Sequence, residues 1–147
     1  MDKLEDLIAV HPRMFRGTPP VVASDLPPGW YGLVDKLCSD IEALLGQEPE
    51  RFEVKQIKEK YGGLRFYFSF EGVEDHFIDL HTPEGIETFV QRPDGPAVMS
   101  QLRKLVSAAA EHSTSTCQRC GAPGTLANRL GWVSTLCERH VTEREAS

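Results

Sequence analysis

Apolar residues recur at helical spacing in three parts of the chain. A short run within residues 2–10 ends at His11-Pro12, a longer one covers about 29–45 and stops at Gly46, and a third covers about 96–112. Spacings of three and four residues place such side chains on one face of a helix. The sequence therefore predicts three amphipathic helices. The longest stripe consists of Trp30, Leu33, Val34, Leu37, Ile41, Leu44 and Leu45.

The spacing of apolar residues changes from helical to alternating after residue 51. Large apolar residues occupy every second position from Leu64 to Phe70, and a weaker alternation over 52–60 becomes irregular near Gln56-Ile57. Period-two patterns are typical of strands with one buried face. The glycines of 61–63 predict the turn of a hairpin, 52–70. Two further strands are expected at 76–80 and 86–91, so the fold class is α+β, with an antiparallel sheet packed by two to three helices.

Composition divides the chain into two expected domains. Residues 1–112 form an α+β core that includes a proline-rich connector at 12–29, and residues 113–147 form a small appended module. We expect the connector to lie across the surface, held there by Met14, Phe15, Val21 and Val22.

Three cysteines and a histidine near the C-terminus have the spacing of a metal site. Cys117 and Cys120 form one pair, and Cys137 and His140 form a second, with sixteen residues between the pairs. Structural zinc sites use thiolate and imidazole ligands in two close pairs joined by a loop. We therefore expect one structural Zn²⁺ in a treble clef, made by a knuckle at 117–121, a hairpin within 125–136 and a helix that begins near Cys137. A catalytic zinc and a chance cluster are the alternatives, but four ligands leave no open position for catalysis.

Charge is distributed unevenly along the chain, whose formal net charge is −6. Residues 1–50 carry nine acids against four bases, and residues 72–95 carry six against one. Only residues 51–71, 96–116 and 117–147 are mildly basic. Nucleic-acid-binding domains are usually strongly basic, so this composition favours a different kind of partner.

The remaining composition is that of a soluble globular protein, with 40% hydrophobic and 26% charged residues. No apolar run reaches membrane-spanning length, and the acidic segment 1–6 is unlike a signal peptide, so we expect no membrane partner. Zinc thiolates and a core thiol at Cys38 indicate a reducing compartment, and the cytoplasm is the expected location.

Three motifs together resemble a group of small, uncharacterised treble-clef or zinc-ribbon-like proteins of phage and bacterial genomes. They are Gly29-Trp30-Tyr31 with the helix to Cys38, the segment Val54 to Tyr67 around Gly62-Gly63, and the zinc motif with Gly131-Trp132. The resemblance spans most of the chain and implies the order helix, hairpin, helix and treble clef. It also implies a mobile-element or accessory gene, but no activity that can be transferred. Relative to such proteins, residues 72–95 look like an insertion, which is also the most acidic internal stretch of the chain.

Two groups of residues outside the zinc motif carry candidate chemistry. Basic and aromatic residues alternate along the hairpin. This arrangement suits contact with the phosphates and nucleobases of a nucleic acid. The alternative is that the basic residues simply pair with neighbouring acidic ones. In the segment Asp75 to His81, the positions 75, 79 and 81 would share one strand face. Carboxylates and an imidazole placed together can bind a second metal ion or transfer protons. The alternative is that they form only an exposed, charged sheet face. The candidate partner contacts are Lys55, Lys58, Lys60, Arg65, Tyr67, Asp75, Asp79 and Glu84.

These observations leave three function classes. The first is a zinc-stabilised protein-binding or regulatory module that inhibits or modulates a basic partner through its acidic surface. The alternative is a nucleic-acid-binding regulator that uses the hairpin lysines and the treble clef. The third is a hydrolase centred on Asp75–His81. Since no strong nucleophile or general base accompanies the zinc motif, the sequence favours a protein that is not an enzyme.

Overall fold

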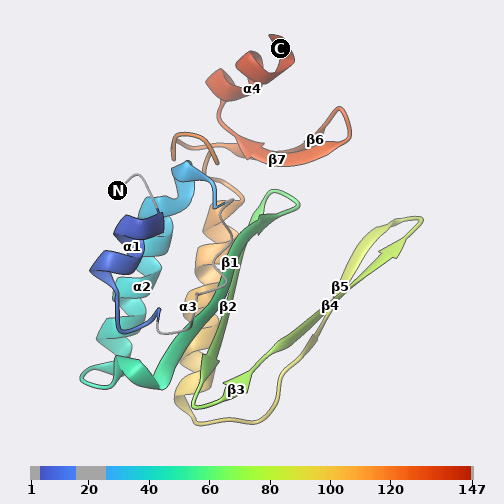
Figure 1. Cartoon of the computed structure of the whole chain (residues 1–147). Coiled ribbons are helices and arrows are strands. Elements are labelled where there is room, and N and C mark those ends of the chain that lie inside the picture. The colour runs from blue at the N-terminus through green and yellow to red at the C-terminus, as the bar shows by residue number, and fades with distance from the viewer. Residues whose placement is uncertain (1–3, 16–25, 147) are drawn as a thin grey trace.

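The computed structural model describes residues 4–15 and 26–146, and it confirms an α+β fold with antiparallel sheets and four helices (Figure 1). Val21 and Val22, predicted to hold the connector, lie outside the described residues. The helices are α1 (Leu4–Val10), α2 (Tyr31–Leu45), α3 (Val98–Ser113) and α4 (Glu138–Ala146), with short 3₁₀ turns at η1 (Pro28–Trp30) and η2 (Pro49–Arg51). The strands are β1 (Phe52–Lys60), β2 (Gly63–Phe70), β3 (Val73–Glu74), β4 (His76–Thr82), β5 (Gly85–Gln91), β6 (Thr125–Arg129) and β7 (Trp132–Leu136).

The central sheet has the order β1-β2-β3, and all of its pairs are antiparallel. Its main hairpin pairs Phe52 with Phe70 at one end and Lys60 with Gly63 at the other. The register shifts between Val54 and Gln56, slightly before the irregularity expected at Gln56-Ile57. Because one extra residue reverses the side-chain alternation, this bulge keeps Val54 and Ile57 both buried.

Helices α2 and α3 cover one face of this sheet, while the other face is turned toward the β4–β5 hairpin (Figure 1). The covered face carries the alternating large residues of β2, and Phe68 stacks on Phe52 with 4.9 Å between ring centroids. The buried core also contains Trp30, Val34, Ile41 and Leu102, as the helical stripes predicted. Met14 and Phe15 are buried as well, which confirms that part of the connector prediction.

The strands of the acidic insertion do not extend the central sheet. Among the described strands, β4 and β5 pair only with each other, from His76↔Gln91 to Thr82↔Gly85, and form a two-stranded hairpin, residues 76–91, that we call the arm. The arm diverges from the body beyond β3 (Figure 1). Asp75 lies before β4 rather than on it, contrary to the prediction that it shares a strand with Asp79.

Helix α1 is fixed to α2 by a buried histidine. His11 is only 2% exposed, and its Nδ1 and Nε2 contact Glu42 Oε1 and Asp35 Oδ1, the latter at 2.7 Å. Cys38 lies between these two carboxylates on α2 and is fully buried. Burial, and then the charges of Glu42 and Asp35, raise the pKa of Cys38 far above its usual range, so it is a neutral core thiol rather than a nucleophile.

The C-terminal segment docks on the start of α2 and on the β1–β2 turn. Trp30 Nε1 donates to the carbonyl of Thr116 at 2.9 Å, and the amide of Gly29 donates to that of Gln118 at 2.8 Å. Thr135 Oγ1 donates to the carbonyl of Gly62 at 2.7 Å. Each of these bonds joins residues more than seventy positions apart, so they fix how the predicted zinc module sits on the body.

Within the described ranges, none of the helices combines the length and the apolar character needed to cross a membrane.

Candidate metal centre and the cleft beneath the arm

The four predicted metal ligands converge at the C-terminal end of the molecule. One ligand atom from each of Cys117, Cys120, Cys137 and His140 lies within 4.8 Å of every other, close enough to bind one metal ion. The Sγ atoms of Cys120 and Cys137 are 3.7 Å apart. His140 Nδ1 lies 3.2 Å from Cys137 Sγ and 3.4 Å from Cys117 Sγ. A tetrahedral zinc site requires about 3.8 Å between two sulfurs and about 3.6 Å between sulfur and nitrogen, so this donor set fits Zn²⁺.

The first ligand pair is shaped by a backbone knuckle. The amide of Cys117 donates to the carbonyl of Ala122 at 2.7 Å, and the amide of Gly121 donates to that of Cys117 at 2.9 Å. Gly121 has φ of 81°, a left-handed conformation that glycine adopts without steric cost.

The thiol of Cys117 loses its proton more readily than an ordinary cysteine, which favours metal binding. Burial alone would raise its pKa, but amides of Cys137, Arg119 and Cys120 donate to the sulfur and lower the pKa to about 6. The amide of Ala122 favours the thiolate of Cys120, but desolvation and the neighbouring thiols of Cys137 and Cys117 together outweigh it, so the pKa of Cys120 is raised. A cation at the centre would displace the remaining thiol protons.

The second ligand pair lies at the junction of β7 and α4. Cys137 directly precedes α4, and its carbonyl accepts from the amide of Val141 at 3.0 Å, which agrees with the prediction of a helix that begins near Cys137. His140 then lies one turn from Cys137 and faces the same side, as its spacing predicted. Knuckle, hairpin β6–β7 and helix α4 follow one another in the order of a treble clef. All four protein ligands are directed inward, which is the arrangement of a closed structural site.

A second candidate site is the cleft between the arm and the uncovered face of β1–β2. This open cleft has a volume of about 960 Å³. Six of the eight predicted partner contacts line it, namely Lys55, Lys58, Lys60, Tyr67, Asp75 and Asp79. Arg65 of β2 also reaches Asp79, with 3.9 Å between its Nη1 and Asp79 Oδ1. Glu84 lies apart, in the turn at the tip of the arm. The structure therefore brings most of the predicted contact residues together.

Asp79 attaches the arm to the sheet. Lys60 Nζ forms an ion pair with it, and Thr88 Oγ1 donates to it at 2.7 Å from the neighbouring strand of the arm. These hydrogen bonds, first from Lys60 and then from Thr88, lower the pKa of Asp79 to about 2. The same contact with Asp79 raises the pKa of Lys60. A carboxylate held in this way is a weak base, which removes one of the groups on which the hydrolase hypothesis depends.

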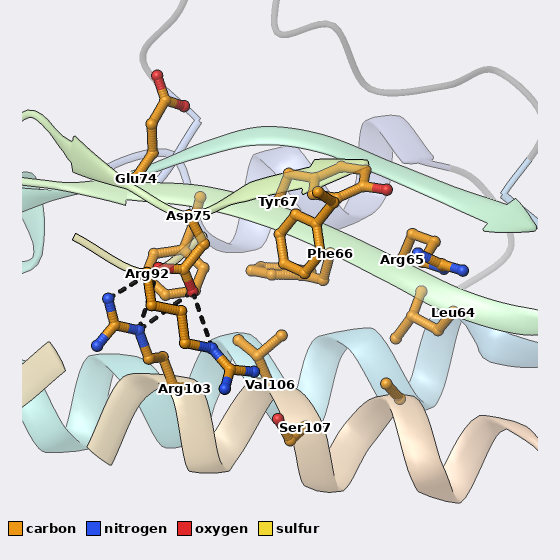
Figure 2. Close-up of a pocket in the computed structure, with 13 residues that line it drawn as sticks. Leu64, Arg65, Phe66, Tyr67, Glu74, Asp75, Arg92, Arg103, Val106 and Ser107 are labelled. Carbon is orange, nitrogen blue, oxygen red and sulfur yellow. Dashed lines mark hydrogen bonds and ion pairs between the residues drawn. The ribbon is translucent and has the colours of Figure 1, made fainter. Parts of the chain in front are cut away.

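Asp75 is held by different cations, at the base of the arm. Arg103 of α3 donates to both of its carboxylate oxygens at 2.8–3.2 Å, and Arg92 Nε lies 3.9 Å away (Figure 2). Two of the acids in the insertion are therefore neutralised within the molecule rather than offered to a partner. His81 packs edge-on against Tyr61, with 6.4 Å between centroids. Among the described residues, the only group of side chains placed to hold a metal is the Cys₃His cluster.

Sequence reasoning missed the apolar character of the arm. Six large side chains of the arm, on both of its faces, are each 38–55% exposed: Phe77, Ile78, Leu80, Ile86, Phe89 and Val90. The apolar residues within 76–80 and 86–91 were the available signal, but they were interpreted only as two further strands of the antiparallel sheet. Arg103 was also missed, because nothing in a helical pattern shows which exposed position meets a distant carboxylate.

Comparisons with protein-family models, with curated proteins and with solved structures found no match. The resemblance to small phage and bacterial zinc proteins therefore stays a prediction.

Proposed function

We propose that the chain is a protein-binding module in which one structural Zn²⁺ fixes the C-terminal segment and the cleft beneath the arm receives the partner. The donor set supports zinc, because three thiolates and one imidazole at tetrahedral separations match the preferences of this ion. A thiolate centre of this kind persists best in a reducing compartment, so we expect the protein in the cytoplasm.

The observation that carries the proposal is the exposed apolar surface of the arm. A two-stranded hairpin is marginally stable in isolation. On the face turned toward the sheet, this one leaves Phe77 and Val90, which pair across its strands, 39% and 38% exposed. Contiguous apolar surface of this kind marks sites of protein interaction. Binding a partner would cover it, and the arm provides edges and faces for such a contact.

Charge in the cleft favours an acidic partner segment. The sheet face beneath the arm carries Lys55, Lys58, Lys60 and Arg65. Against these, Glu53 lies 3.5 Å from Lys55, Asp79 pairs with Lys60, and Glu74 lines the cleft, while Asp75 is neutralised by Arg103 of α3. Four bases therefore face three acids that Arg103 does not neutralise, which changes the sequence-based expectation of a basic partner into one of a partner with acidic groups at this surface.

Site-specific photocrosslinking tests the proposal. A benzophenone-bearing phenylalanine analogue at position 77 in the cleft, with the chain expressed in its native host, should give a discrete protein adduct. A second change, Lys58→Glu, should reduce the yield of that adduct by reversing charge in the cleft. The matched control is the same analogue at position 10, where Val10 is 54% exposed on α1. Equal adducts from both positions, or none from position 77, would refute the proposal.

A nucleic-acid-binding regulator is the second candidate, favoured by one observation. The ammonium groups of Lys58 and Lys60 lie over the rings of Tyr67 and Tyr61, at 5.6 and 5.5 Å from their centroids. Cations interleaved with aromatic rings are typical of single-strand binding surfaces. Fluorescence anisotropy with labelled single- and double-stranded oligonucleotides at low salt tests it. An unchanged anisotropy at micromolar protein would exclude this candidate.

A further inference from the structure

The edge of β2 that lies opposite β1 is only partly paired. Strand β3 pairs with β2 only at Ser69↔Glu74 and Phe70↔Val73, and the chain then leaves β2 to form the arm. Within the described part of the chain, no strand pairs with residues 64–68 of β2 on the side opposite β1. The amide of Leu64 donates to Ser113 Oγ of α3 at 2.9 Å, which shows that one end of this edge is directed away from β1. An open edge presents backbone donors and acceptors to any extended segment.

A cavity of about 130 Å³ lies beside this open edge, between β2 and α3. Figure 2 shows Phe66 above it and Val106 and Ser107 rising from α3 below, while Asp75 and its arginines close one end. An apolar cavity of about 150 Å³ accommodates a benzene molecule. This cavity is slightly smaller, which suits one aliphatic side chain of about the size of leucine.

The cavity and the cleft beneath the arm are adjacent. They share four lining residues, Tyr67, Glu74, Asp75 and Phe77, so they lie on the two sides of the same stretch of β2. Successive side chains of a strand point to opposite faces of a sheet. A segment paired with β2 would therefore direct the residue opposite Phe66 into the cavity and both neighbours of that residue into the cleft, where Arg65 and Lys58 lie.

We infer that the partner binds as an extended strand added to the open edge of β2. One large apolar residue of that strand fills the cavity, and acidic residues on both sides of it face Arg65 and Lys58. This inference rests on the proposed function and adds the conformation and the residue pattern of the partner. Because the amide of Leu64 already donates to Ser113, backbone hydrogen bonds at Phe66 and Phe68 supply affinity, and the cavity and the basic cleft supply specificity.

A phage-displayed library of random heptapeptides, selected on the zinc-loaded full chain, tests the inference. Selection should enrich peptides with a large apolar residue flanked by aspartate or glutamate. A synthetic peptide of the selected sequence should bind about tenfold more weakly to Ser107→Leu, which fills the cavity from an exposed helix position. Ala110→Leu fills the same cavity from a half-buried position and should give a similar loss. The matched control, Ala108→Leu, lies on α3 away from the cavity and should bind within about twofold of the unchanged chain.

Methylation of the backbone nitrogens of the selected peptide separates strand addition from side-chain contact alone. If a strand forms, methylation at the positions that pair with β2 weakens binding about tenfold or more. Peptides that bind through Lys58 but ignore both methylation and Ser107→Leu would overturn this inference and leave the proposed function standing. Failure to enrich any peptide above background also overturns the inference. If photocrosslinking still captures a partner when the selection fails, the proposed function stands without strand addition.

Discussion

Gly29 contacts the metal knuckle so closely that adding one methyl group there, as in Gly29→Ala, gives the most specific prediction. A Cβ atom at Gly29 would lie 2.1 Å from the carbonyl oxygen of Cys117 and 2.7 Å from backbone atoms of Gln118 and Gly121. All three neighbours are main chain, so no side-chain rotation relieves the overlap. Gly29→Ala therefore forces the knuckle and the start of α2 apart.

The cost can be worked from these distances. Restoring ordinary van der Waals contact requires a shift of about 1.3 Å, which breaks the 2.8 Å hydrogen bond from Gly29 to Gln118. Loss of that bond costs about 0.5–1.5 kcal/mol, and overpacking in a well-packed region costs about 1–3 kcal/mol. We expect Gly29→Ala to lower the free energy of unfolding by about 2–4 kcal/mol.

Urea denaturation of the zinc-loaded chain measures this change, and Gly32→Ala is the matched control. Gly32 lies three residues further on in α2, and a Cβ there meets nothing within 4 Å. The same substitution should leave stability unchanged or raise it by up to about 1 kcal/mol, because alanine favours the helix. If Gly29→Ala is as stable as the unchanged chain, the knuckle does not dock on α2 as described.

Three further predictions concern the arm, the docking of β7 and the core thiol. The pKa of Asp79 lies near 2, below its ordinary value of 3.8, so its ion pair with Lys60 stabilises the docked arm above about pH 4 and is lost as the pH falls through about 2. NMR spectra of arm amides should show that loss on acidification, whereas Asp79→Asn should show the undocked arm already at pH 7. Thr135→Val removes the buried donor to the carbonyl of Gly62 and should cost about 1–3 kcal/mol in urea denaturation. Iodoacetamide should leave Cys38 unmodified in the folded chain, as read by peptide mass spectrometry, because the thiol is buried and its pKa is raised.

Each of these has a contradicting result. An identical pH dependence in Asp79→Asn would mean that another group controls the arm. A stable Thr135→Val would mean that β7 is held to Gly62 by something other than this hydrogen bond. Alkylation of Cys38 at the rate of an exposed thiol would mean that the core around α2 opens readily.

The elements with strong local patterns were the ones that the sequence predicted well. The stripe from Trp30 to Leu45 and the alternation from Leu64 to Phe70 depend on burial of one face, and both faces are buried as expected. The metal ligands were predicted equally well, since two short spacings within 117–140 are typical of a tetrahedral site. In these cases the local spacing and the tertiary contact carry the same information.

The arm shows where sequence reasoning reaches its limit. The residues of 76–80 and 86–91 predict strands but do not show whether these strands join an existing sheet, and here they form a separate hairpin. Its position depends on Asp75 meeting Arg103 and on Asp79 meeting Lys60, pairs that are nineteen or more residues apart. The same is true of the bond between Trp30 and Thr116. No periodicity encodes such long-range polar contacts.

The metal centre and the cleft have separate roles in this account. The closed Cys₃His cluster orders the C-terminal segment, which docks on Gly29, Trp30 and Gly62. The arm, the open edge of β2 and the cavity beside α3 then provide the contact surface. Since Thr135 links the zinc module to the turn between β1 and β2, loss of the metal should also disturb the end of the sheet that borders the cleft.

Native mass spectrometry of the purified chain tests the central claim, a single zinc ion held by Cys117, Cys120, Cys137 and His140. The account predicts a mass one zinc ion above that of the polypeptide, and the metal-free mass for Cys137→Ser. A metal-free mass for the unchanged chain purified without chelator, or retention of zinc by Cys137→Ser, would contradict it.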